Sequence, residues 1–243
     1  MPSSLQVSEQ AEERLALGLA MIAGYVDAYG FISYRTYVSF MSGNTTQTGF
    51  LIGQDNLAVA VPALLAIVSF LIGVFTGTFL RHSGLTHSGA SQSHWLPFGW
   101  VATLLAVNLG VTHLGPLASG VGIATLSLAM GLMNTALSRV GAQSVNLVFV
   151  TGTLNTMAQH LALAVKRAPL PEARGSWDTH RRRAFLLMGV WASFLTGAVL
   201  AGVATSRFGV WVLLLPVMTL LALARRESVG GRPLLVGKGA RTD

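Results

Sequence analysis

The chain has 243 residues, of which 52% are hydrophobic and only 10% charged, and its net charge is +7. Soluble domains carry about 25% charged residues, so this composition excludes an ordinary water-exposed surface and predicts an all-α polytopic membrane protein. The sequence contains no cysteine, which excludes disulfides and thiolate metal ligands.

The predicted elements follow from apolar stretches long enough to cross a hydrocarbon core of about 30 Å. Residues 1–13 are acidic and do not resemble a secretory signal, so we expect them to form a short cytoplasmic lead. Six predicted spans then occupy residues 14–34, 57–80, 95–112, 116–138, 184–206 and 208–224. Two less apolar segments, 36–54 and 145–166, lie between them, and 225–243 is a basic tail that we place in the cytoplasm.

The first predicted span contains Asp27, the only acid deep inside an apolar stretch. An ionised carboxylate at the bilayer centre costs about 2.5–3.5 kcal/mol on insertion scales, so this side chain should face protein, water or a cation. Burial also favours its protonated form, which makes Asp27 a candidate for proton coupling. The alternative is a carboxyl that joins two helices by hydrogen bonding.

The segment 36–54 contains Phe40-Met-Ser-Gly-Asn-Thr-Thr-Gln, a cluster of hydroxyl and amide groups around a predicted helix break. We expect extended residues up to Met41, followed by a half-helix with Ser42 or Asn44 as its N-cap. The free N–H groups and partial positive charge at such a helix start suit a polar or anionic solute. The predicted substrate-binding residues of this half are Asp27, Ser42, Gly43, Asn44 and Thr45.

A second copy of this arrangement follows about a hundred residues later. Gly131-Leu-Met-Asn134 precedes Phe149-Val-Thr-Gly-Thr153, and Ser69-Phe-Leu-Ile-Gly73 recurs as Ser193-Phe-Leu-Thr-Gly197. We therefore predict two transmembrane repeats, residues 14–112 and 116–224, with the site at their interface near the membrane centre. The predicted substrate-binding residues of the second half are Asn134, Thr151, Gly152, Thr153 and Asn155.

The number of crossings depends on the two broken segments. If they enter the membrane and return, there are six full crossings, an inverted repeat, and fourteen Lys/Arg inside against two outside. If they cross, there are eight crossings, a parallel repeat, and twelve Lys/Arg inside against four outside. Both arrangements place both termini in the cytoplasm by the positive-inside rule.

The Gly-x-x-Asp-Ala and Ser-Gly-Asn-Thr motifs, with the later Val-Thr-Gly-Thr, resemble the YoaK-type family of bacterial inner-membrane proteins, a family of unknown function. The resemblance covers residues 14–224, with Ser42 where the family generally has Thr and Met133-Asn134 where Gln-Asn is expected. It implies a multi-pass protein of the bacterial inner membrane and no particular activity.

The residues favour a small-solute secondary transporter, with proton coupling through Asp27 as a hypothesis. The alternatives are a membrane-embedded enzyme or lipid-handling protein using the same polar centre, and a non-transporting sensor or partner subunit that docks through the basic loop 166–183.

No catalytic, cofactor or metal motif is present, so we predict no enzyme activity, no cofactor and no metal, although His82, His87 and His94 lie close in sequence. The clustering of basic residues indicates topology rather than nucleic-acid binding. The partners predicted are the lipid bilayer and a small polar or anionic solute.

Overall fold

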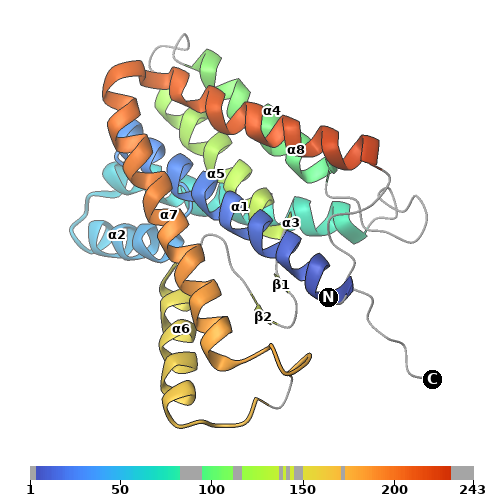
Figure 1. Cartoon of the computed structure of the whole chain (residues 1–243). Helices are drawn as coiled ribbons and strands as arrows, with labels where there is room; N and C mark the ends of the chain where they lie inside the picture. Colours follow the sequence, from blue (N-terminus) through green and yellow to red (C-terminus); the bar gives the residue numbers. More distant parts are fainter. Residues whose placement is uncertain are drawn as a thin grey trace.

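The computed structural model describes residues 4–82, 95–111, 117–136, 139–140, 143–144, 150–170 and 173–230. The first half contains α1 (Ser4–Tyr34), α2 (Met41–Gly53), α3 (Leu57–His82) and α4 (Trp95–Val111). The second half contains α5 (Ala118–Ala136), α6 (Val150–Val165), α7 (His180–Phe208), the 3-10 helix η2 (Gly209–Leu213) and α8 (Leu214–Gly230). Two short strands, β1 (Arg139–Val140) and β2 (Gln143–Ser144), pair antiparallel. Figure 1 shows the helices in one bundle, with α2 and α6 at its edges.

Each predicted span and each predicted broken segment coincides with a helix or with η2 and α8 together. The largest difference is at the start, where α1 begins at Ser4 rather than at residue 14. Acidic residues are compatible with a helix, and Glu9 and Glu13 also pair with Arg182 of α7, which favours continuation of the helix through the predicted lead.

Four stretches within the described residues are long and apolar enough to cross a membrane: Glu9–Tyr34, Leu57–His82, Ala118–Ala136 and His180–Arg226. Their outward faces are apolar. On α3, for example, Leu71, Phe75 and Phe79 are 60%, 70% and 61% exposed. Large exposed apolar faces are unfavourable in water and suit contact with lipid tails.

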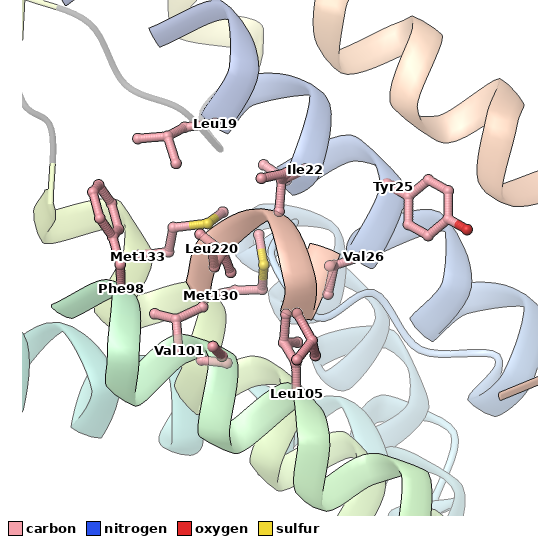
Figure 2. Close-up of a cluster of buried hydrophobic side chains, with 14 of the residues drawn as sticks. Leu19, Ile22, Tyr25, Val26, Phe98, Val101, Leu105, Met130, Met133 and Leu220 are labelled. Atoms are coloured by element: carbon pink, nitrogen blue, oxygen red, sulfur yellow. The ribbon is translucent and has the colours of Figure 1, made fainter. Parts of the chain in front are cut away.

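The buried centre joins α1, α4, α5 and α8 through interdigitated apolar side chains (Figure 2). The side chains that form it include Leu19, Ile22, Val26, Phe98, Val101, Leu105, Met130, Met133 and Leu220. This centre lies beside the break between α1 and α2, and it holds the end of α1 that carries Asp27.

A glycine crossing joins α1 to α7. A Cβ atom on Gly24 would overlap the carbonyl oxygen of Phe194, and a Cβ atom on Gly197 would overlap the carbonyl oxygen of Met21. Only glycine permits backbones to approach this closely, as in small-residue contacts between membrane helices.

A second glycine crossing joins α3 to α5. A Cβ atom on Gly73 would overlap the carbonyl oxygen of Leu128, and one on Gly131 would overlap the carbonyl oxygen of Phe70. Each glycine crossing therefore pairs a helix of the first half with a helix of the second half.

The contacts define the relative directions of the helices. α1 and α7 run parallel, because Arg182 near the start of α7 pairs with Glu13 near the start of α1. α3 and α5 also run parallel, because Gly73 lies against Leu128 and Arg81 donates to Thr135 O. α5 begins where α1 ends: Gly122 in its first turns packs against the ring of Tyr34, the last residue of α1.

Candidate functional site

The chain leaves α1 at Arg35, whose φ of 55° lies in the left-handed region, and turns back along the same helix. Val38 then packs against Gly30, where a larger residue would collide with it. Asp27 Oδ1 accepts hydrogen bonds from the backbone N–H groups of Val38 (3.0 Å) and Ser39 (2.8 Å). Asp27 lies seven residues before the end of α1, which corresponds to about 10 Å along the helix. The break before α2 is therefore well inside the bundle.

Asn44 holds the other side of the same peptide group. Its Nδ2 atom donates to the carbonyl oxygen of Tyr37 at 2.7 Å, and that carbonyl belongs to the peptide unit whose N–H group bonds to Asp27. Both side chains are buried, Asp27 at 6% and Asn44 at 0% exposure. Together they satisfy a backbone segment that has no helical partners, and such segments are costly in a membrane unless they are satisfied by protein.

The expectation that Ser42 or Asn44 would cap α2 is wrong. The helix begins at Met41, and its N-cap residue is Phe40, which makes no side-chain capping bond. Asn44 lies within the helix, where its side chain bonds backward to Tyr37 instead. The segment before α2 returns beside the helix start, which brings the carbonyl oxygen of Tyr37 within reach of the Asn44 amide.

The remaining predicted residues around this helix start have different surroundings. Ser42 and Thr45 are exposed, and the Thr45 hydroxyl donates to Met41 O in its own helix. Gly43 is half-buried against the Phe40 ring, which a Cβ atom would overlap. The structure thus brings Asp27 and Asn44 together around one peptide group and leaves the predicted hydroxyls of Ser42 and Thr45 outside the buried region.

One buried face of α2 carries unsatisfied polar atoms. Asn44 Oδ1 and Thr48 Oγ1 have no hydrogen-bond partner among the described residues, and the two residues lie one helical turn apart on the same face. Their side chains are 0% and 8% exposed. Buried oxygen atoms of this kind normally have partners, so this face of α2 has the capacity to bind a polar group or water.

The second half has a comparable set of residues. Asn134 is half-buried on α5, and its Oδ1 atom has no hydrogen-bond partner among the described residues. On α6, Thr153 is buried, Gly152 half-buried, and Thr151 and Asn155 are exposed. The residues before α6 that would correspond to the segment held by Asp27, 145–149, lie outside the described part of the chain.

The relation between the two half-helices remains a prediction. α2 packs mainly against α3, and α6 packs mainly against α7. Figure 1 shows both short helices beside the central bundle. Of the histidines considered for metal binding, His82 bonds to Thr78 O in its own helix, whereas His87 and His94 lie outside the described residues.

Asn108 is a buried polar residue that the sequence reasoning missed. It is 0% exposed on α4, its Oδ1 atom accepts from Tyr34 OH at 3.0 Å, and its Nδ2 atom donates to Thr125 Oγ1. This network joins α1, α4 and α5 at the end of α1 that precedes the break. The signal in the sequence was an amide inside the predicted span 95–112.

Comparisons with known proteins place this architecture in a family. Residues 15–225 match the family described as "Protein of unknown function (DUF1275)". The chain is 22% identical over 216 residues to UPF0700 transmembrane protein YoaK of Bacillus subtilis (strain 168), covering 84% of this chain and 89% of that protein. It is 25% identical over 213 residues to UPF0700 transmembrane protein RA0705 of Rhizobium meliloti (strain 1021), covering 86% and 83%.

No solved structure matches the chain. The family match covers most of the sequence, the relatives are named transmembrane proteins, and the outward helix faces are apolar. The chain is therefore an integral membrane protein and belongs to the DUF1275 family.

Proposed function

We propose that α1, α3, α4, α5, α7 and α8 cross the bilayer, and that α2 and α6 enter and return from opposite sides. α2 and α6 have 13 and 16 residues, about 20 and 24 Å of helix, which is short for a core of about 30 Å. α1 and α5 occupy corresponding places in the two halves yet run in opposite directions, which favours an inverted repeat over a parallel one.

The glycine crossings support the two repeats. Gly73 meets Leu128, which precedes Gly131 by three residues, and Gly197 meets Met21, which precedes Gly24 by three residues. The reciprocal contacts match as well, because Gly131 and Gly24 meet the phenylalanines three residues before Gly73 and Gly197. Such agreement between two distant contacts favours a common plan for both halves.

For orientation, we propose a bacterial inner-membrane protein with both termini in the cytoplasm. In the six-crossing arrangement, Arg35 and Arg207 are on the outer side, and the other fourteen Lys/Arg residues are on the side of the termini. This distribution agrees with the positive-inside rule.

Within this architecture we infer a secondary transporter for a small polar or anionic solute. The observation that carries the inference is the buried face of α2, where Asn44 Oδ1 and Thr48 Oγ1 have no partner among the described residues. A half-helix starts beside this face, so its first N–H groups add a partial positive charge of about 0.5 at membrane depth. An inverted repeat places such a site where it can be reached alternately from either side.

A pair of threonine variants on α2 tests the transport site. Thr48→Val removes a buried hydroxyl with no partner among the described residues, and Thr46→Val removes an exposed hydroxyl that donates to Ser42 O in its own helix. Proteoliposomes would be assayed for uptake of isotope-labelled inorganic phosphate, sulfate, nitrate and short carboxylates. We expect flux above that of protein-free liposomes, a loss of about tenfold in Thr48→Val, corresponding to about 1.4 kcal/mol, and little change in Thr46→Val. Absence of flux for every solute, or equal flux in both variants, would contradict the proposal.

Proton coupling has a separate test. Both backbone bonds to Asp27 end on Oδ1, and an amide oxygen has two lone pairs that can accept both. Asp27→Asn should therefore preserve the break while removing the titrating group. We expect this variant to exchange solute down its gradient but to lose uptake driven by an imposed pH gradient. Unchanged pH-driven uptake would exclude coupling through Asp27.

A further inference from the structure

The connection between α6 and α7 is the main difference between the two halves at one face of the bundle. α2 and α3 are joined by only three residues, 54–56, whereas residues 166–179 separate α6 from α7. Figure 1 shows α6 alongside the first part of α7, with this loop at their common end. The described part of the loop is held by contacts to α6 and α7.

Asp178 anchors the loop to the start of α7. Arg183 donates to both of its carboxylate oxygens, at 2.9 and 2.8 Å, and the backbone N–H of Arg174 donates to Oδ2 at 3.1 Å. The hydrogen bonds from Arg183 hold the pKa of Asp178 below its ordinary value. This pair therefore stays charged while groups with pKa values near neutrality titrate.

Arg182 anchors the same end of α7 to α1. Its guanidinium bonds to Glu13, lies 3.7 Å from Glu9, and stacks 4.5 Å above the Trp177 ring. Arg182 and Arg183 thus both make ion pairs with other residues of the protein. Of the run Arg181–Arg183, only Arg181 is exposed.

Two histidines join α6 to α7 beside these ion pairs. The Nδ1 atoms of His160 and His180 lie 2.8 Å apart, and the ring centroids are 5.1 Å apart. His180 is 7% exposed, and its Nε2 atom faces Pro169 O at 3.5 Å. A hydrogen bond between two Nδ1 atoms requires that one carries a proton and the other does not.

We propose that the His160–His180 pair is a pH-sensitive latch, which holds the end of half-helix α6 on α7 at neutral pH and releases it on acidification. When both rings are protonated, both Nδ1 atoms carry hydrogen, the bond is lost and two like charges face each other. Histidine is the side chain that ordinarily changes charge within the physiological pH range, so acidification is the trigger that we propose.

Neighbouring charged groups also influence the second protonation of the histidine pair. Arg183 of α7 and Asp178 of the loop act on His160. Arg174, Arg182, Glu9 and Glu13 belong to the adjoining charge cluster between the loop, α7 and α1. The positive charge of Arg183 disfavours a second proton on the pair, whereas the negative charge of Asp178 favours it. Asp178 is already paired with Arg183. Any effect of the latch on solute access rests on the proposed function, because Thr153 of the predicted site lies on α6. The latch itself does not depend on the proposed function.

The absence of native cysteine allows the latch to be measured directly. Leu163→Cys on α6 and Phe185→Cys on α7 are both exposed positions for paired spin labels. In the full-length protein in liposomes, we expect a short, narrow distance distribution at about pH 7.5 and a longer, broader one at about pH 5. This readout does not require transport, so failure of the latch and failure of the transport proposal are distinguishable.

Two histidine variants complete the experiment. The double variant His160→Gln, His180→Gln retains a donor and an acceptor but cannot titrate, so its distance should no longer respond to pH. His82→Gln, at the end of α3 and bonded only locally to Thr78 O, is the matched control and should respond like the unsubstituted background. A distance that does not change with pH in that background, or that still changes in the double variant, would overturn the latch.

Discussion

Asp27 and Asn44 bond to opposite sides of the peptide group between Tyr37 and Val38. The carboxylate accepts from the N–H side and the amide donates to the C=O side, so each residue type matches the polarity of the group that it satisfies. This arrangement accounts for an acid in α1 without requiring titration, because the acceptor is needed by the break itself. In the proposed repeat Asn134 takes the place of Asp27, and an amide oxygen has the two lone pairs that two such bonds need.

At this position we expect the two substitutions of Asp27 to differ in stability. Asp27→Asn keeps an acceptor at Oδ1 and should unfold at nearly the temperature of the unsubstituted protein. Asp27→Leu leaves the N–H groups of Val38 and Ser39 buried without partners, and each such group costs about 1–3 kcal/mol. Thermal unfolding in detergent, followed by circular dichroism, measures the difference. Equal losses of stability in both variants would show that Asp27 does not stabilise the fold by accepting these hydrogen bonds.

Asp178 predicts a dependence of stability on acid. Its pKa is lowered in the folded protein by Arg183, so the folded carboxyl releases its proton more readily than the unfolded one. The pair therefore stabilises the fold above the unfolded pKa of about 4, and this contribution is lost as the pH falls through the folded pKa. Asp178→Asn should lower the stability at neutral pH and flatten the decline in acid. Unfolding temperatures measured across pH, with parallel slopes for both proteins, would contradict this.

Among the elements, the close helix pairs depend on glycine. Gly197 on α7 meets the backbone of Met21, whereas Gly202, on the same helix, has no atom near the place where a Cβ would lie. The two positions have the same residue type and helical context, and they differ in the approach of a second backbone. Hydropathy predicted the helices, but the partner of each glycine depends on residues far away in the sequence.

The substitutions Gly197→Ala and Gly202→Ala should therefore change stability in opposite directions. Gly197→Ala forces α1 and α7 apart and should cost about 1–3 kcal/mol, as overpacking does. Gly202→Ala meets no obstacle, and the better helix propensity of alanine should add about 0.5–1 kcal/mol. Denaturant unfolding in mixed micelles measures both. Similar effects of the two substitutions would mean that the glycine crossing does not limit the approach of the helices.

At the scale of the whole molecule, the helices that the proposed repeat pairs with one another run in opposite directions. α1 and α5 are the clearest pair, since Tyr34 at the end of one meets Gly122 near the start of the other. The halves differ at the junction of α6 and α7, where the loop 166–179 contributes an ion pair and the two helices contribute the histidine pair. The inverted repeat that we propose is therefore reinforced at one face only, which suits directional regulation.

The topology can be tested with single cysteines. Asp55→Cys lies in the turn between α2 and α3, and Ser176→Cys lies in the loop before α7, both at exposed positions. With six crossings, a membrane-impermeant maleimide added to intact cells should label Asp55→Cys and not Ser176→Cys. With eight crossings, both residues would lie in the cytoplasm and neither would be labelled before permeabilisation. Labelling of Ser176→Cys in intact cells would reverse the proposed orientation.

The sequence alone determined the membrane class, the helical segments and the positions of the two short polar segments. These follow from local composition, because a bilayer requires each crossing to be apolar over its whole length and makes polar interruptions conspicuous. It also grouped Asp27 with Asn44, and the structure shows that both side chains bond to one peptide group.

Only the tertiary structure decided how those residues are used. The bonds of Asp27 and Asn44 to one peptide group, the start of α2 at Met41, the network of Asn108 and the contact of His160 with His180 all depend on a chain reversal or on residues distant in sequence. Composition and periodicity carry no information about which backbone returns beside which side chain. That choice is made when the helices pack.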